Sequence, residues 1–397
     1  MTEQQKNVLA ILQDSTKTHE QTMMALAKAG ENLLDTPGVS SEYDEMKAKG
    51  LICDLNEGHA PYSPRYILPD YAKFMREGSA FLRLTPPTDL LDATTKLLIF
   101  YHHVPSVTHF PVFIGRLDEL LEPFVEQESP DFAKKVLKGF LLQIDRTITD
   151  SFCHGNIGPK DSKTARILLE CMRELQDSTP NMTLRYDPDV TPDDFAVECV
   201  RTALDCANPS FGSHPMFLSE FGPEYGIASC YNGLPIAGGA FTLTRLILAR
   251  IADGASSLDN FFAEQLPHAI EVMCAFMDAK IRFLVEETPF FSSNFLVKEG
   301  FINKERFNGL FGMVGLCECV NRLMALEGKS FRFGHDPQAD QLGVRIMDFI
   351  LAKVNAHENP YCPFWNHHFM LHAQVGIETD FGISPGTRIA IGEEIPL

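Results

Sequence analysis

The sequence predicts an α/β fold, and three observations lead to this prediction. Amphipathic helical segments alternate with short apolar segments that end in polar or glycine-rich loops, which is typical of helices packed around a buried sheet. The 397 residues are 45% hydrophobic, enough to bury one large core. No proline- or serine-rich linker and no evident internal repeat divides the chain. We therefore expect one domain over residues 1–397, with residues 1–50 as a helical lead-in.

Helices are predicted where apolar residues recur at intervals of three and four positions. Ser162 is expected to cap one of them, because a serine hydroxyl accepts a hydrogen bond from a backbone N–H in the first turn. The expected helical ranges are 129–152, 191–206, 242–248, 259–286, 304–327 and 339–356.

Strands are predicted where a short apolar run stops at polar residues. The expected strands are 97–104, 182–186, 226–230 and 295–297. The polar residues at or after their ends are His102, His103, Asp187, Asp189, Tyr231, Asn232, Lys298 and Glu299. In α/β barrels the carboxyl ends of the strands are where active sites are built, so these residues are candidates for a site.

Charge and cysteine content exclude several classes of protein. The formal net charge is -19 and the sequence pI about 5.1, so nucleic-acid backbones and anionic membranes would repel the chain. No apolar run is long enough to span a bilayer, and the N-terminus has no signal-peptide pattern. Ten scattered cysteines without a CxxC pair suit reduced thiols rather than a disulfide framework or a zinc cage. We expect a cytoplasmic protein that binds neither nucleic acid nor membrane.

The segment 226–240, GIASCYNGLPIAGGA, is the strongest candidate for chemistry. A short apolar run ends on Cys230 and opens into a turn that is rich in glycine. Glycines let the backbone and a substrate come close, so a cysteine presented there is more plausibly a reactive thiol than a packed one.

Histidine clusters offer a different hypothesis, a mononuclear metal site. The candidate ligands are His59, His102, His103 and His372. Adjacent histidines on a strand face opposite ways, so at most one of His102 and His103 would enter a shared site. There is no HExxH motif and no carboxylate at a convincing interval. A solvated loop at 56–62 and structural histidines elsewhere are the alternative.

Two further patterns are weak. Cys153 and His154 are adjacent, and neighbours on a helix end do not face each other, so no catalytic pair is implied. Gly238 and Gly239 precede the expected helix 242–248 and could cradle a phosphate, but neither GxGxxG nor GxxxxGK[ST] is present.

Seven segments carry a resemblance to a known family. They are 52–62 (ICDLNEGHAPY), 101–108 (YHHVPSVT), 156–159 (NIGP), 186–194 (YDPDVTPDD), 229–232 (SCYN), 295–300 (FLVKEG) and 370–374 (MLHAQ). In this order, from about residue 50 to the last residue, they resemble the YjjI family of glycyl radical enzymes, bacterial anaerobic proteins without an assigned reaction.

The resemblance implies a ten-stranded α/β barrel of two opposed five-stranded halves, with two loops meeting at its centre. One loop carries a cysteine, which Cys230 matches here, and the other carries a glycine near the C-terminus. In such enzymes a radical-SAM activating enzyme removes a hydrogen atom from the glycine. The radical then passes to the cysteine, and the resulting thiyl takes a hydrogen atom from a small-molecule substrate.

The sequence departs from the family at the radical glycine. That residue normally lies in an Arg-Val-x-Gly-aromatic motif, which does not occur in these 397 residues. The run from Arg388 to Gly392 has one residue too many, and Glu393 stands where an aromatic residue is expected. The barrel is therefore expected to be C-terminally incomplete, with no bound cofactor and with the glycyl radical supplied in trans.

Three hypotheses follow from this departure. The first is an enzyme completed by a separate chain that carries the glycine loop, with the activating enzyme as a second partner. The second is a truncated, non-catalytic barrel that binds a ligand or a partner. The third is the metal protein described above. Homodimers are common in the wider superfamily, so a homodimer is also an expectation.

The site residues expected from the resemblance centre on Cys230 as the thiyl residue, with Asn232 shaping its loop. Glu299, His103, His59 and His372 are candidates for substrate contact or acid/base work, because each lies in a matched segment. Structural hydrogen bonding inside a large barrel is the alternative role for these four.

Overall fold

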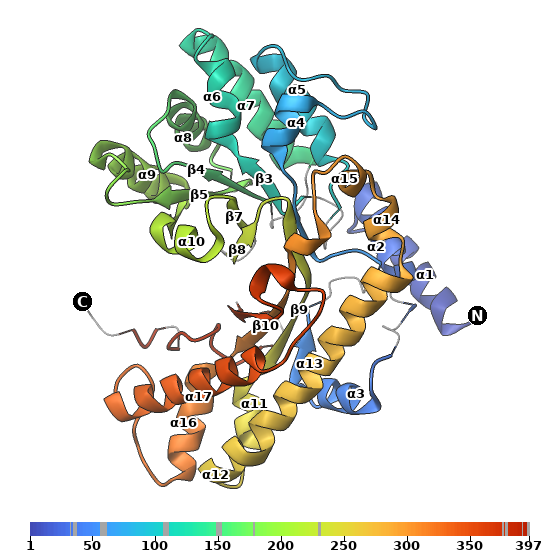
Figure 1. Cartoon of the computed structure of the whole chain (residues 1–397), viewed down its shortest axis with the longest axis vertical. Coiled ribbons are helices and arrows are strands. Elements are labelled where there is room, and N and C mark those ends of the chain that lie inside the picture. The colour runs from blue at the N-terminus through green and yellow to red at the C-terminus, as the bar shows by residue number, and fades with distance from the viewer. Residues whose placement is uncertain are drawn as a thin grey trace.

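The computed structural model describes most of the chain as an elongated α/β molecule whose two larger sheets lie in opposite halves (Figure 1). The described residues are 1–397 without 32, 35–37, 56–61, 106–110, 148–152, 178, 229–231, 375–376, 378–379, 391 and 395–397.

The upper half in Figure 1 holds a parallel sheet of four strands in the order β3-β4-β5-β6. These are β3 Phe113–Arg116, β4 His154–Ile157, β5 Asn181–Tyr186 and β6 Ser210–Ser213. Because parallel neighbours need a crossover, helices connect them and cover the sheet. The helices of this half are α4 Tyr71–Glu77, α5 Leu90–Tyr101, α6 Leu117–Val125, α7 Pro130–Thr147, α8 Lys163–Leu175, α9 Asp193–Cys206 and α10 His214–Phe221.

The lower half holds a five-stranded sheet built on one long strand, β9. On one edge β9 pairs parallel with β10, which pairs parallel with β11, and on the other edge β1 and β2 pair antiparallel with β9. The strands are β1 Ile52–Asp54, β2 Tyr66–Leu68, β9 Gly238–Ile247, β10 Phe307–Val314 and β11 Met370–Ala373. Every residue of β9 and β10 is buried, so these two strands have no face in water.

Helices surround the lower sheet. The long helix α13 crosses it diagonally in Figure 1 and is extended at both ends by π-helical turns, η1 and η2. The helical elements are α11 Leu248–Asp253, α12 Leu258–Asn260, η1 Phe261–Gln265, α13 Leu266–Arg282, η2 Phe283–Glu287, α14 Phe290–Ser293, α15 Phe295–Lys298, η3 Lys304–Arg306, α16 Leu316–Leu326, α17 Pro337–Asn355 and η4 Pro363–Trp365.

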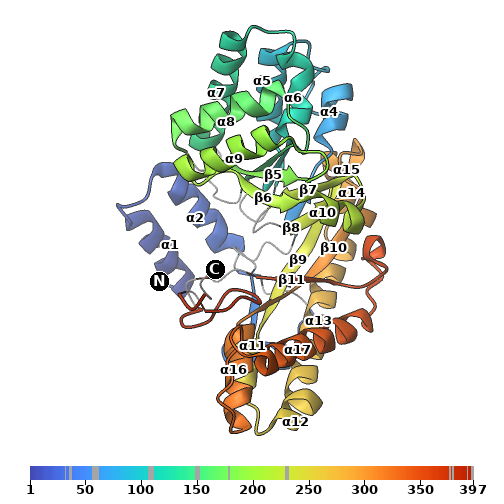
Figure 2. The same cartoon turned by 90° about the vertical axis from the view of Figure 1, so that its left-hand side faces the viewer.

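The N-terminal region forms three helices, α1 Glu3–Gln13, α2 His19–Glu31 and α3 Ser41–Ala48. Figure 2 shows α1 and α2 as a pair beside the body of the molecule, and neither contains a buried residue in its described part. By contrast α3 buries Tyr43, whose ring stacks on Phe276 of α13 at a centroid distance of 3.8 Å. Over the part of the chain that the structure describes, no helix has both the length and the apolar character to cross a membrane.

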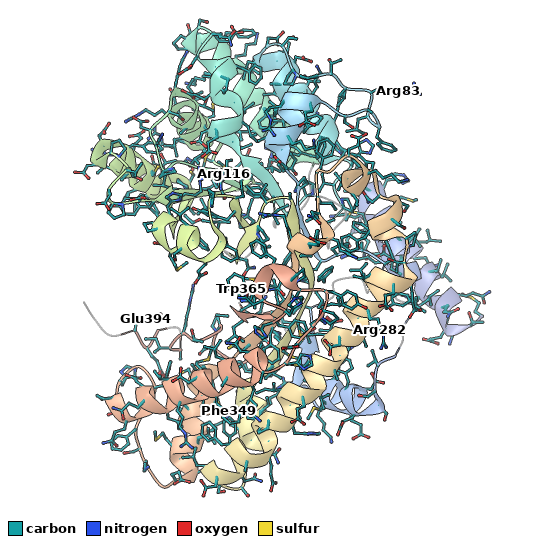
Figure 3. The ribbon with its side chains drawn as sticks, viewed as in Figure 1. Arg83, Arg116, Arg282, Phe349, Trp365 and Glu394 are labelled. Atoms are coloured by element: carbon teal, nitrogen blue, oxygen red, sulfur yellow. The ribbon has the colours of Figure 1, made fainter. Side chains whose placement is uncertain are left out.

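A hairpin lies between the two halves. Its strands, β7 Tyr225–Ala228 and β8 Asn232–Pro235, pair antiparallel with each other and form a sheet of their own (Figure 1). The chain continues from β8 through a short turn into β9, so the hairpin connects the upper and lower halves. A second junction lies at Trp365 (Figure 3), whose ring centroid is 5.3 Å from that of Phe221 in α10.

The predicted α/β fold and most predicted elements are confirmed. The helices expected at 129–152, 191–206, 259–286 and 339–356 correspond to α7, α9, the run from α12 to η2, and α17, and Ser162 accepts the expected cap bond from Ala165 N at 3.0 Å. The strands expected at 182–186 and 226–230 are β5 and β7.

Two predicted helices are wrong over the residues that form strands, and the second is confirmed only over α16. Range 242–248 lies mostly in β9, and range 304–327 contains β10 before α16 begins. A strand buried on both faces shows no alternation of apolar and polar residues, so its sequence cannot be told from a buried helix by periodicity. Gly238 and Gly239, the weak pattern for a phosphate cradle, therefore form the start of a strand rather than a loop before a helix.

Two predicted strands are wrong because the segments are helical. Range 97–104 covers the end of α5 and the turn after it, and range 295–297 is in the short helix α15. Within α5 the exposed positions are Leu91, Thr95 and Ile99, which is a helical spacing. Two of them are apolar, so this period is hidden in the sequence. Cys153, expected at a helix end, instead directly precedes β4.

We expect Gly239→Ala to destabilise the protein by roughly 3 kcal/mol. Gly239 has φ +154°, and a Cβ there would lie 1.9 Å from the Tyr66 carbonyl oxygen. This oxygen is a backbone atom of β2, so it cannot shift without disturbing the pairing of β2 with β9. Urea unfolding followed by circular dichroism measures the change.

The matched control is Gly139→Ala in α7, where a Cβ meets no atom within 4 Å. This variant is expected to be about 0.5–1 kcal/mol more stable, because alanine favours the helix. Equal stabilities of the two variants would contradict the close approach of β2 to β9.

Candidate active site

The hairpin β7–β8 frames the segment that contains Cys230. The strand register pairs Ala228 with Asn232, and residues 229–231 between them lie outside the described residues. All four residues of β7 and all four of β8 are buried. The structure therefore describes how both flanks of the cysteine segment are held, and these contacts define the candidate site.

The side chain of Asn156 in β4 holds β7 by two hydrogen bonds. Its Nδ2 donates to the Ile227 carbonyl oxygen at 2.8 Å, and its Oδ1 accepts from the Ile227 N–H at 2.8 Å. Asn156 and Ile227 are both 0% exposed. The amide thus satisfies a donor and an acceptor of the β7 backbone that water cannot reach.

Arg116, the last residue of β3, holds the start of the same strand. Its Nη2 and Nε donate to the Tyr225 carbonyl oxygen at 2.7 and 3.2 Å, and Nη2 also donates to the Pro223 carbonyl. The Tyr225 hydroxyl lies 2.6 Å from Nδ1 of His214. The base of the hairpin is therefore bound to the carboxyl end of the upper sheet.

Two glycines let the hairpin pack closely. A Cβ on Gly226 would lie 2.7 Å from the Phe113 ring, and one on Gly233 would lie 2.5 Å from both Phe217 and Phe221. Larger residues would push the hairpin away from β3 and α10.

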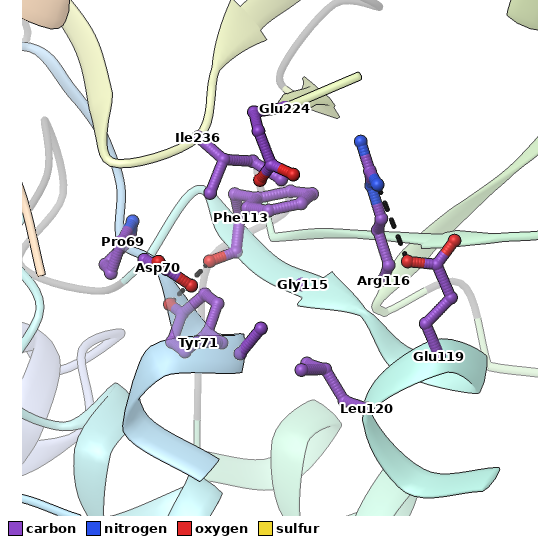
Figure 4. Close-up of a pocket in the computed structure, with 11 residues that line it drawn as sticks. Pro69, Asp70, Tyr71, Phe113, Gly115, Arg116, Glu119, Leu120, Glu224 and Ile236 are labelled. Carbon is purple, nitrogen blue, oxygen red and sulfur yellow. Dashed lines mark hydrogen bonds and ion pairs between the residues drawn. The ribbon is translucent and has the colours of Figure 1, made fainter. Parts of the chain in front are cut away.

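Two pockets adjoin the hairpin base. The first, of about 270 Å³, is lined by Asp70, Tyr71, Arg116 and Glu224 among others, and in Figure 4 the Tyr71 hydroxyl points to the Phe113 carbonyl, to which it donates at 2.7 Å. The second has a volume of about 570 Å³. Among the described residues, none that the sequence predicted as part of the site lines either pocket.

Each of the four upper strands ends at this second pocket. Its lining includes Arg116 from β3, Gly158 after β4, Arg185 from β5 and His214 after β6. Asp118 accepts a hydrogen bond from the Gly158 N–H at 2.7 Å, and burial raises its pKa to about 7. The sequence prediction missed these residues, although the position of Arg185 at the end of a predicted strand was a usable signal.

His372 lies on β11 in the lower sheet. It is 8% exposed, and burial lowers its pKa to about 4. Among the described residues its Nε2 and the Oε1 of Gln374 have no hydrogen-bond partner. The register pairs both His372 and Arg245 with Gly312, so these two side chains leave the sheet on the same face.

Arg245 is neutralised on that face by a buried ion pair. Its Nη1 and Nη2 donate to the two carboxylate oxygens of Asp380 at 2.6 and 2.8 Å, and Asp380 also accepts from the Ile377 N–H at 2.8 Å. The pair anchors the segment after β11 over the sheet. Such bidentate contacts fix geometry as well as charge.

The remaining predicted residues lie in different places. Asn232 begins β8, is 8% exposed, and its Nδ2 has no partner within the described part of the chain. Glu299 accepts a hydrogen bond from the Phe81 N–H at 2.6 Å, and the exposed ring of His103 lies 6.4 Å from the Phe81 ring. These two therefore share a location around Phe81. His59, like Cys230, lies outside the described residues.

The histidines of the metal hypothesis are not brought together where the structure describes them. His102 and His103 are exposed at the end of α5, whereas His372 is buried on β11. Among the described residues, no three histidine, cysteine, aspartate or glutamate side chains form a group that could hold a metal ion.

Comparison with known proteins identifies relatives along nearly the whole chain. A family model described as glycyl radical enzyme YjjI-like matches residues 17–397. The uncharacterized protein YjjI of Escherichia coli is 45% identical over 376 residues, which are 94% of this chain and 72% of that protein. An uncharacterized protein of Haemophilus influenzae is 44% identical over 395 residues, 98% of this chain and 76% of that protein.

Solved structures show the same fold at low sequence identity. The anaerobic ribonucleotide reductase from Thermotoga maritima, in complex with dATP and CTP, matches with a TM-score of 0.72 and 13% identity, over 95% of this chain and 72% of that chain. A glycyl radical enzyme from Archaeoglobus fulgidus matches with a TM-score of 0.58 and 14% identity, over 94% and 59%. The fold is thus that of the glycyl radical enzyme barrels, and the chain belongs to the YjjI-like family of glycyl radical enzymes.

Proposed function

We propose that this chain is the barrel of a glycyl radical enzyme in which Cys230 abstracts a hydrogen atom from a small-molecule substrate. The observation that carries the proposal is the buried hairpin, anchored by Asn156 and Arg116, that brackets Cys230 in a chain of this family. Burial of a thiyl radical limits its side reactions with solvent and oxygen.

Each step of the proposed chemistry moves one hydrogen atom. The Cys230 thiol gives its hydrogen atom to the glycyl radical, so the glycine regains its Cα–H bond and the sulfur becomes a thiyl. The thiyl then takes a hydrogen atom from a substrate carbon, so the S–H bond re-forms as the C–H bond breaks. The radical glycine comes from outside these 397 residues, because its motif is absent from them. A radical-SAM activating enzyme is the proposed partner that generates it.

We expect Cys230→Ser to abolish transfer of the radical to sulfur while leaving the glycyl radical intact. The chain is reconstituted anaerobically with an activating enzyme and a polypeptide that carries the Arg-Val-x-Gly-aromatic motif, either separate or fused. Electron paramagnetic resonance detects the glycyl doublet. In D₂O the doublet collapses when the hydrogen on the glycine Cα exchanges with the solvent through an S–H group. We therefore expect the doublet to collapse in the wild type and to persist in Cys230→Ser.

Cys206→Ser is the matched control, because its Sγ donates to the Thr202 carbonyl and a serine hydroxyl can do the same. It is expected to behave as the wild type. Collapse of the doublet in Cys230→Ser would refute the assignment of the thiyl residue. Absence of a glycyl radical in both the separate and the fused arrangement would favour the alternative function, a non-catalytic barrel that binds a ligand or a partner.

His372 enters this proposal as a neutral hydrogen-bonding group for the substrate. Its buried ring stays uncharged at neutral pH because burial lowers its pKa from 6.5 to about 4. Together with Gln374, it offers buried polar atoms without partners among the described residues. Neutral hydrogen-bonding groups suit a polar substrate whose reacting step moves no charge.

We expect the wild type to lose about 2 kcal/mol more stability than His372→Gln between pH 7 and pH 5. The folded pKa is depressed, so below pH 6.5 the unfolded chain binds a proton that the folded chain does not, and stability falls until pH is near 4. Urea unfolding at the two pH values measures the difference.

His335→Gln, the loss of an exposed imidazole, is the control and is expected to follow the wild type. Parallel pH dependence in the wild type and in His372→Gln would contradict a buried neutral His372.

A further inference from the structure

We infer that Asn156 is a positioning residue for the radical chemistry of Cys230, acting through β7. This inference rests on the proposed function for the role of Cys230. The contact itself rests on the geometry of Asn156 and Ile227 alone.

The hairpin needs side-chain anchors because it lacks ladder bonds to a larger sheet. Among the described residues β7 and β8 pair only with each other, although β7 packs against β3 and β4. A two-stranded hairpin is marginally stable by itself in water. Its position relative to the barrel therefore depends on the groups that bind its backbone from outside.

An asparagine is suited to this task. Its side-chain amide has the same donor and acceptor as a peptide group, and it is neutral, so its burial carries no cost of desolvating a charge. Asn156 binds both polar atoms of Ile227 and so stands in for one pair of a β-ladder. An aspartate in its place could accept from the Ile227 N–H but could not donate to the carbonyl.

Arg116 and Asn156 act at adjacent points. They are direct cross-strand partners in the β3–β4 register, and the residues that they bind, Tyr225 and Ile227, are two positions apart and so lie on the same side of β7. Two fixed points on one strand define its direction as well as its place. From Ile227, the second of these points, the chain continues toward Cys230.

Of the two contacts, the one between Asn156 and Ile227 matters more for the position of Cys230, because it is the closer of the two along the chain. Cys230 follows Ile227 by three residues, which span at most about 10 Å when extended. Loss of the Ile227 anchor would leave the nearest side-chain anchor of the β7 backbone at Tyr225, five residues from Cys230. Hydrogen-atom transfer needs close contact, and a misplacement of about 1 Å is enough to slow a reaction about 100-fold.

The test compares Asn156→Leu with Thr183→Val in the reconstituted protein. Thr183 pairs with Asn156 across the β4–β5 register and is 0% exposed, but its hydroxyl pairs with Ser210 at 2.9 Å instead of binding β7. Both variants remove a buried hydrogen-bonding group from the same row of the sheet. Asn156→Asp, which retains one of the two bonds, is included in case Asn156→Leu does not fold.

Two readouts are measured on each variant. Hydrogen exchange mass spectrometry over residues 225–228 reports on the anchor without any radical chemistry, and Asn156→Leu is expected to raise exchange at least about tenfold. The rate at which the glycyl doublet collapses in D₂O reports on the cysteine, and it is expected to fall about 10- to 100-fold. Thr183→Val is expected to leave both within about twofold of the wild type, and Asn156→Asp to give intermediate values.

Three outcomes would overturn the inference. The first is unchanged hydrogen exchange at 225–228 in both Asn156 variants. The second is faster hydrogen exchange together with an unchanged rate of collapse of the glycyl doublet. The third is equal effects of Thr183→Val and Asn156→Leu. A wild-type rate of collapse in Cys230→Ser would instead overturn the proposed function, while exchange at 225–228 would still report on the anchor.

Discussion

The contact between the Asn156 amide and the Ile227 backbone is the constraint on which the centre of the molecule depends. On one side it fixes β7 to the upper sheet through hydrogen bonds to a single residue. On the other side β8 leads directly into β9, to which β1, β2 and β10 all pair. The hairpin is thus fixed to one half by side chains and continuous with the central strand of the other. Its placement relates the two halves to each other.

Buried ion pairs restrict the lower half in a similar way. Arg245 of β9 binds Asp380, and Lys280 of α13 binds the two carboxylate oxygens of Asp54 in β1 at 3.0 and 3.1 Å. In each case a charge is compensated by a residue more than 100 positions away. Buried pairs contribute less to stability than their geometry suggests, because both ions lose their hydration. Their effect here is to join the segment after β11, and α13, to the same sheet.

The fold was predictable where one face of an element is in water. The helices α7, α9 and α17 each turn one apolar face to the core, and those buried residues recur with the 3.6-residue period even though Val197, Val200 and Leu204 of α9 are exposed. The strands β9 and β10 are buried on both faces and show no alternation, so the sequence predicts helices over much of them. In the site, a glycine-rich turn and a family motif pointed to Cys230. Asn156 begins the matched segment 156–159, but no role could be assigned to it or to Arg116, because their partners lie 71 and 109 residues away.

The chemistry proposed for Cys230 explains why anchors of this kind matter more than charges. A hydrogen atom carries no net charge, so fixed dipoles and ions have little to stabilise when it moves between carbon and sulfur. Distance and direction remain as the main means of control. A neutral amide such as Asn156 is well suited to this role, since it holds the backbone without adding a titratable group beside the site. Arg116, the charged member of the pair, lies at the base of the hairpin, where Glu119 and the Tyr225 carbonyl surround it. Along β7 the charged anchor thus lies at the base of the hairpin, and the neutral amide lies nearer the cysteine. This arrangement suits hydrogen-atom transfer, because that step moves no charge.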